Sequence, residues 1–203
     1  MALNSFVRHA RALAALSLIA GAIVLAVGTA PASGGLGLAC PGSTTKPFAP
    51  WSDYANYAFL PDGGFEAGAS GWNLNGARVV PGNETYFIHA ASDRNSLSLP
   101  AGKSATSPPM CISLLSSKMR FVVRGDSGAK VKVQVIYRGL LSSVLGIFDG
   151  GTVSAGGSWK PSPQIGMLGG VLPLLTASVQ FRFTAVNGTV LLDDIYLDPM
   201  KSA

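Results

Sequence analysis

The stretch 118–137, KMRFVVRGDSGAKVKVQVIY, decides the fold that the sequence predicts. Apolar and polar residues alternate on both sides of the turn sequence 125–128, from Met119 to Val123 and again from Val131 to Tyr137. A period of two is typical of strands with one buried face, because successive side chains of a strand point to opposite faces. We therefore expect an antiparallel hairpin with its turn at 125–128.

The same pattern returns near the end of the chain. Residues 177–184 (ASVQFRFT) place Val179, Phe181 and Phe183 on one face, and the Asn187-Gly188 pair that follows is a strong signal for a hairpin turn. A closing strand is expected at 189–199, TVLLDDIYLDP. Shorter strands are predicted at 65–66, 72–75, 78–81 and 96–99.

These strands, separated by turn signals about every 8–12 residues, favour an all-β fold, an antiparallel β-sandwich. The composition agrees, because 25 glycines and 13 prolines suit many turns and no helical period stands out after residue 33. We divide the chain into a segment 1–32, an extended N-terminal arm at 33–58 and the sandwich domain at 59–200.

The segment 1–32 has the order of a secretory signal peptide. Arg8 and Arg11 precede an apolar run at 12–27, and Ala30-Pro31-Ala32 offers small residues for cleavage. We expect a signal helix, export to the cell envelope or the extracellular space, and no membrane span in the mature chain. The alternative, an uncleaved membrane anchor, stays open.

Export bears on the two cysteines, Cys40 and Cys111, because both follow the signal segment. An even pair in an oxidising compartment usually forms a disulfide. Closing a loop of about 70 residues would stabilise the fold by on the order of 4 kcal/mol. A metal pair or a reactive thiol finds no histidine or further cysteine at ligand spacing.

Charge and missing motifs exclude several functions. Two of the 15 basic residues and none of the 10 acidic residues precede residue 33, which leaves 13 against 10 and a net charge of +3. So mild a charge argues against a nucleic-acid partner. His89, with Asp93 four residues on, is the single histidine after residue 33, and we expect it in a loop or on a sheet surface. No nucleophile elbow or zinc-type histidine pair is found, so we expect no catalysis.

Three phrases resemble a known family: residues 62–66 (DGGFE), Gly71-Trp72 and residues 192–195 (LDDI). They resemble the opening and closing phrases of galactose-binding-like jelly rolls, which include many carbohydrate-binding modules, although Asp62 stands where the family has Asn. The resemblance covers about residues 60–199 and implies a jelly roll, in which we expect the first and final strands to lie side by side. Phrases such as 96–102 and 105–111 also resemble secreted bacterial proteins of no assigned activity.

The resemblance to carbohydrate-binding modules implies a structural calcium ion. Glu66 and one of Asp193 or Asp194 match the positions that hold it in those relatives. We expect only one aspartate to join Glu66, because neighbours on a strand face opposite sides. The alternative is that these carboxylates cap loop N–H groups or pair with a nearby Arg or Lys.

Six polar residues are predicted to point away from the core and to form a sugar-binding surface. They supply planar groups with several hydrogen-bond donors and acceptors, and their basic character suits an anionic glycan. They are Arg120, Arg124, Lys132, Gln134, Gln180 and Arg182. The alternative is an ordinary solvated sheet face.

Aromatic rings at the loop ends are a second candidate surface, with packing as the alternative. They are Trp51, Tyr54, Tyr57, Tyr86, Phe87 and Trp159. The sequence thus predicts a secreted, non-catalytic module that binds a cell-wall or extracellular polysaccharide. The competing interpretation is a structural or adhesive envelope protein that contacts other proteins without binding sugar.

Overall fold

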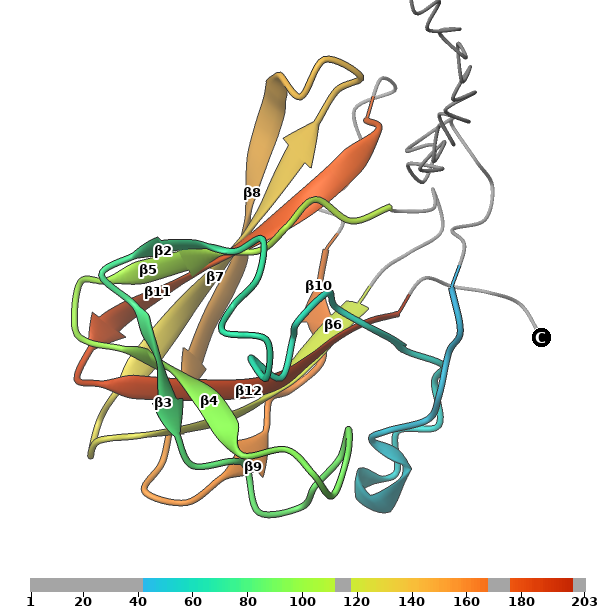
Figure 1. Cartoon of the computed structure of the whole chain (residues 1–203). Coiled ribbons are helices and arrows are strands. Elements are labelled where there is room, and N and C mark those ends of the chain that lie inside the picture. The colour runs from blue at the N-terminus through green and yellow to red at the C-terminus, as the bar shows by residue number, and fades with distance from the viewer. Residues whose placement is uncertain (1–41, 112–117, 168–175, 199–203) are drawn as a thin grey trace, which may run out of the picture. The chain divides into compact units, whose positions relative to one another are not determined.

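The computed structural model describes residues 42–111, 118–167 and 176–198. These residues form two antiparallel β-sheets packed face to face, which confirms the predicted all-β sandwich (Figure 1). The signal segment and Cys40 lie outside the described residues. None of the helical structure found in the described ranges has the length and hydropathy needed to cross a membrane.

The described residues form twelve strands and one short helix. In chain order they are η1 (Ala49–Trp51), β1 (Ala58–Phe59), β2 (Asn73–Asn75), β3 (Arg78–Pro81), β4 (Asn95–Leu99), β5 (Ser104–Thr106), β6 (Lys118–Gly125), β7 (Lys130–Arg138), β8 (Val144–Ser154), β9 (Lys160–Pro161), β10 (Ile165–Gly166), β11 (Ser178–Asn187) and β12 (Val190–Asp198). Here η1 is a short 3₁₀ helix.

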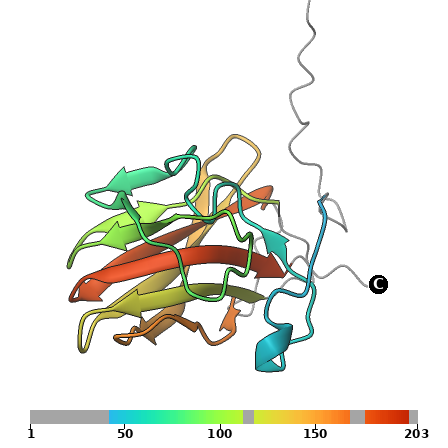
Figure 2. The same ribbon diagram turned by 60° about the horizontal axis from the view of Figure 1, so that its bottom comes forward.

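One layer is a seven-stranded sheet with the order β10-β6-β12-β4-β3, to which β1 adds beside β12 and β9 beside β6. The other layer is a five-stranded sheet with the order β2-β5-β11-β7-β8. All pairs are antiparallel, and strands far apart in sequence lie side by side in both layers, as the two views show (Figures 1 and 2).

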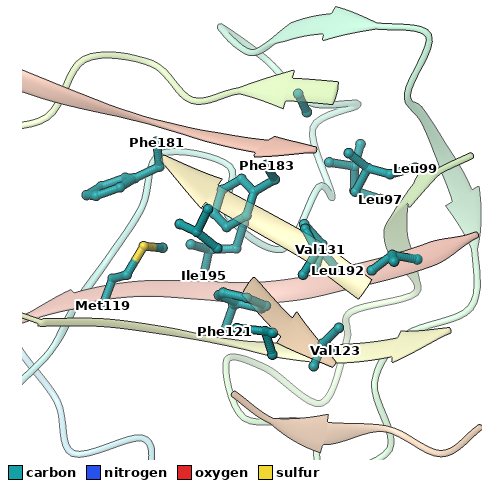
Figure 3. Close-up of a cluster of buried hydrophobic side chains, with 14 of the residues drawn as sticks. Leu97, Leu99, Met119, Phe121, Val123, Val131, Phe181, Phe183, Leu192 and Ile195 are labelled. Atoms are coloured by element: carbon teal, nitrogen blue, oxygen red, sulfur yellow. The ribbon is translucent and has the colours of Figure 1, made fainter. Parts of the chain in front are cut away.

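The core lies between the two layers, and the alternation seen in the sequence fills it as expected. Phe181 and Phe183 of β11 face Phe121 of β6, and the rings of Phe121 and Phe183 meet edge to face at 5.3 Å between centroids (Figure 3). Val131 of β7 and Leu192 of β12 are fully buried in the same cluster. Each such side chain contributes roughly 2 kcal/mol to folding.

The predicted hairpin at 118–137 is wrong, because β6 and β7 belong to different sheets. The turn at 125–128 crosses from one layer to the other, and the turn at Asn187-Gly188 does the same between β11 and β12. Each crossing supports the other: Asp126 N donates to Thr189 O at 3.0 Å, and Thr189 N donates to Asp126 Oδ2 at 2.7 Å. Alternation fixes which face of a strand is buried but not which strand it pairs with.

The expected strand at Phe65-Glu66 is also wrong, since neither residue belongs to a strand: Glu66 lies in a turn, and Phe65 has a φ of 62°. The opening phrase nevertheless lies beside the closing one, as predicted. Leu60 N donates to Ile195 O at 3.0 Å, and Ile195 N donates to Gly63 O at 3.2 Å. The strand that pairs with β12 at this point is β1, at Ala58–Phe59.

The described part of the N-terminal arm, residues 42–58, packs against the outer face of the seven-stranded sheet. Phe48 and Tyr57 are fully buried and form an aromatic cluster with Tyr196 of β12. The Phe48 ring meets those of Tyr57 and Tyr196 edge to face, at 5.2 and 5.6 Å between centroids. This packing closes part of one outer face of the sandwich.

Candidate functional site

The six predicted ligand-binding residues do not form one surface, because the hairpin that would have joined them does not exist. Arg120 and Arg124 lie on β6 in the seven-stranded sheet. The other four lie on β7 and β11 of the five-stranded sheet: Lys132, Gln134, Gln180 and Arg182.

Arg120 is buried beneath the N-terminal arm. Its Nη1 lies 2.8 Å from Asp53 Oδ2, and its Nε and Nη2 donate to Ser162 O at 2.9 and 2.7 Å. The guanidinium also lies over the Phe48 ring, 4.4 Å from its centroid. Arg120 therefore holds the arm in place and has no donor left on an open surface.

The electrostatics of this ion pair fit a structural role. Burial alone would raise the pKa of Asp53, but hydrogen bonds from Gln164, Arg120 and Tyr57 outweigh it and lower the pKa to about 2. Tyr57 donates its hydroxyl to Asp53 Oδ2 at 2.8 Å. Arg124, by contrast, is exposed, with its guanidinium 5.4 Å from the centre of the Trp159 ring.

The outer face of the five-stranded sheet carries a hollow of about 480 Å³, which we call the polar groove. Strand register sets its residues in two rows, because partners in adjacent antiparallel strands share a face. One row is Asn73, Thr106, Arg182 and Gln134, and the other is Asn75, Ser104 and Thr184. The groove residues are thus amides, hydroxyls and one guanidinium.

Arg182 is the cation of this groove. It is half-buried, and its Nε approaches Thr106 Oγ1 at 3.4 Å. No Asp or Glu lines the groove in the described part of the chain. The neighbouring Lys132 differs, since its Nζ lies 2.9 Å from Asp149 Oδ2. Arg182 thus presents a charge that no carboxylate of the groove neutralises.

Gln180 is committed to the protein itself. Its Oε1 accepts a hydrogen bond from Arg138 Nε at 2.6 Å, and its Nε2 donates to Ser107 O at 2.8 Å. Of the six predicted residues, Gln134 and Arg182 line the groove. The asparagine, serine and threonine residues of the groove were not predicted. Nothing in their local sequence marks them as site residues before the strand register is known.

The predicted calcium ligands accept hydrogen bonds from nearby loops, beginning with Glu66. Glu66 Oε1 accepts hydrogen bonds from Arg94 N and Asn95 N, both at 2.7 Å, and Oε2 accepts one from Asn95 Nδ2 at 3.1 Å. The carboxylate therefore caps a loop, which is the alternative that the sequence left open.

Asp193 and Asp194 do not face opposite sides of β12. The register shifts between Asp193 and Tyr196, and Asp194 has a φ of 46°, which marks a β-bulge. Both side chains are fully buried and turn to the same loop: Asp193 Oδ2 accepts from Glu84 N at 2.9 Å and Asp194 Oδ2 from His89 N at 3.0 Å. The expectation from strict alternation fails because the bulge inserts an extra residue.

The loop at 82–94 and the bulge bring three potential metal ligands together. Ligand atoms of His89, Asp93 and Asp194 all lie within 4.8 Å of one another, and Glu66 is not part of this group. His89 Nδ1 lies 2.8 Å from Asp93 Oδ2, and the Phe59 ring stacks on the imidazole at 3.9 Å. Glu66, Asp193 and Asp194 each accept hydrogen bonds from backbone N–H groups, and the calcium site that the resemblance implied stays a prediction.

Burial dominates the electrostatics of this cluster. Together with the neighbouring carboxylates, it raises the pKa of Asp193 to about 9 and that of Asp194 to about 7. Glu84 is also fully buried, with its carboxylate on the backbone N–H groups of Tyr86 and Ile88. Several acids thus share one enclosed space.

Three of the six aromatic candidates stay exposed, among them Tyr86 at 44%. Trp51 and Tyr86 meet edge to face at 4.9 Å, and Tyr86 donates its hydroxyl to Trp159 O at 2.7 Å. Tyr54 and Phe87 keep large exposed fractions, 67% and 48%. Phe87 borders a second hollow of about 550 Å³ beside the loop at 82–94.

The disulfide stays a prediction, since Cys40 lies outside the described residues. Cys111 lies next to Met110, which bridges to Val179 of β11. No cysteine in the described ranges is free.

Solved structures that are similar to this chain include carbohydrate-binding modules. The CBM22-1 xylan-binding domain of Paenibacillus barcinonensis Xyn10C matches with a TM-score of 0.48 and 17% identity, over 69% of this chain and 93% of that one. Its CBM22-1-CBM22-2 tandem gives 0.50 and 16%, over 72% and 47%. The family 11 module of Clostridium thermocellum Lic26A-Cel5E gives 0.45 and 15%, over 73% and 98%.

The similar structures also include an enzyme. Part of the arabinose-bound MgGH51 α-L-arabinofuranosidase matches with a TM-score of 0.49 and 14% identity, over 73% of this chain and 27% of that one. No protein-family model and no curated protein matches the chain. The likeness supports the jelly-roll fold that the resemblance implied.

Proposed function

We propose that this chain is a secreted, non-catalytic carbohydrate-binding module whose ligand site is the polar groove of the five-stranded sheet. The observation that carries the proposal is the pair of cross-strand rows, which present amides, hydroxyls and one guanidinium on a single hollowed face. Sugar hydroxyls act as donors and acceptors at once, and such side chains complement them.

The groove favours an anionic polysaccharide, such as one that contains uronic acids. Arg182 can bind a carboxylate through two parallel hydrogen bonds, and no acidic side chain lines the groove in the described residues. Aromatic rings are likewise missing from the lining residues, so affinity has to come from hydrogen bonds and charge. We place the protein outside the cytoplasm, in the envelope or the extracellular space.

Binding to a polysaccharide panel tests the proposal. Saturable binding to one acidic class is expected, and Arg182→Ala should weaken it roughly tenfold or more, because a charged hydrogen bond is worth about 1.5–3 kcal/mol. Gln134→Ala should weaken it less. Arg124→Ala is the matched control, since Arg124 is an exposed arginine on the other sheet and should leave binding unchanged. Equal losses for both arginines would contradict the groove.

A second candidate function rests on the tip of the β7–β8 hairpin. Leu140 and Leu141 are 73% and 93% exposed, and Val144 and Ile147 are about half exposed. A cluster of exposed apolar side chains commonly marks a protein contact. This favours a structural or adhesive role. Two results together would support it: no binding to any polysaccharide of the panel, and a protein partner whose binding the Leu141→Ser substitution abolishes.

A further inference from the structure

We propose that His89, Asp93 and Asp194 bind a divalent metal ion of the zinc or manganese type, through one imidazole nitrogen and two carboxylate oxygens. Their ligand atoms lie within 4.8 Å of one another, a separation that one ion can bridge. Two come from the loop at 82–94 and the third from the bulge of β12, so the site joins segments about a hundred residues apart.

An oxygen without a partner points to a missing cation. Asp194 is fully buried, and its Oδ1 has no hydrogen-bond partner in the described residues. A Cβ placed on Gly64 would lie 3.2 Å from Asp194 Oδ1 and 3.8 Å from Asp93 Oδ2. Both oxygens therefore border the same space, which glycine leaves open. A buried carboxylate oxygen without a donor is costly, and a metal ion would remove that cost.

The charge around the cluster also calls for a cation. Glu84 and Asp193 are fully buried next to the three ligands, and Asp193 binds the backbone N–H of Glu84. Four acidic groups thus face a single imidazole. Buried charges in proteins are normally paired or coordinate a metal. A divalent ion bound between them would stabilise the charged forms of these acids.

The ligand types select the metal. Calcium takes six to eight oxygens, and the glutamate expected to supply one, Glu66, is committed to the N–H groups of Arg94 and Asn95. An imidazole nitrogen with two carboxylates suits zinc or manganese instead. The His89 side chain is 39% exposed, which gives an entry path and room for water as a further ligand.

Metal titration of chelator-treated, untagged protein tests this inference. We expect zinc or manganese to bind with a stoichiometry of one and to raise the melting temperature, with calcium weaker at the same concentration. His89→Ala and Asp194→Asn should each weaken that binding at least tenfold. Glu66→Gln is the control and should leave the metal affinity unchanged.

Three results would overturn the inference: no binding of any ion, zinc binding unaffected by His89→Ala, or calcium binding that depends on Glu66. In the first case His89 has a structural role through its hydrogen bond with Asp93. The groove lies on the other sheet, so polysaccharide binding by His89→Ala reports on the proposed function separately.

Discussion

At the scale of single residues, burial decides whether a polar side chain can meet a ligand. Arg120 and Arg182 occupy equivalent positions in two alternating patterns, with polar side chains opposite an apolar face. The arm covers the first, which pairs with Asp53, while the second lines an open groove. Arg120 therefore contributes mainly to stability, because salt screens an ion pair only weakly when the pair lies away from water.

The Asp53 carboxylate should make stability depend on pH. Its pKa in the folded protein is about 2, below the ordinary 3.8, so it stabilises the fold above pH 4 and loses that effect as the pH falls toward 2. The Asp53→Asn variant should lack this stabilisation at every pH, because it has no carboxylate to ionise. The difference in unfolding free energy between wild type and variant should shrink by about 2 kcal/mol between pH 5 and pH 2. Urea unfolding over this range measures it, and a constant difference would contradict the assignment.

At the scale of elements, the two layer-crossing turns form one unit. Gly188 has a φ of 65°, and a Cβ there would lie 2.9 Å from Ala129 Cβ, in the turn that links β6 to β7. Asn187 Nδ2 also donates to Gly128 O at 3.0 Å across the same contact. The crossings are therefore packed against each other, and this fixes which strand enters which sheet.

Gly188→Ala should destabilise the protein more than Gly102→Ala. Gly102 has a φ of 74° with open space around it. Gly102→Ala should therefore cost only the free energy of holding alanine in a left-handed conformation, about 1–2 kcal/mol. Gly188→Ala adds the overlap with Ala129, for a total of about 2–4 kcal/mol. Both losses can be measured from the shift in the denaturant midpoint, provided that the dependence of the unfolding free energy on denaturant concentration stays the same. Equal losses of stability in the two variants would mean that the two layer-crossing turns are not packed tightly against each other.

At the scale of the whole molecule, distant segments have to be held together. The opening phrase, the bulge of β12 and the loop at 82–94 meet at one place, where Gly63, Asp194 and His89 are neighbours. The polar groove likewise needs β2, β5, β11 and β7 in one sheet. Both candidate sites therefore depend on long-range pairing rather than on any local motif.

The predicted disulfide between Cys40 and Cys111 should reinforce that long-range order. Reduction should lower the free energy of unfolding by on the order of 4 kcal/mol, the entropy of closing a loop of about 70 residues. Cys40→Ser with Cys111→Ser should show the same loss and no further effect of reductant. Two reactive thiols in denatured, unreduced protein would rule the bridge out.

The sequence alone determined the fold class and the buried faces. Val133, Phe121 and Phe183 are fully buried as their alternation predicted, because the side-chain period of a strand is a local property. The adjacency of the opening and closing phrases followed from the family resemblance, and the hydrogen bonds of Ile195 with Leu60 and Gly63 confirm it.

Only the tertiary structure decided the strand partners, the groove and the ligand cluster. The turn at 125–128 looks like a hairpin in sequence, and nothing local tells a turn within a sheet from one between sheets. The bulge that turns Asp193 and Asp194 to one side is set by pairing with β6, and the row that joins Asn73 to Arg182 is set by strand register. Pairing and register are choices among distant segments, so their free energies appear only when the whole chain is packed.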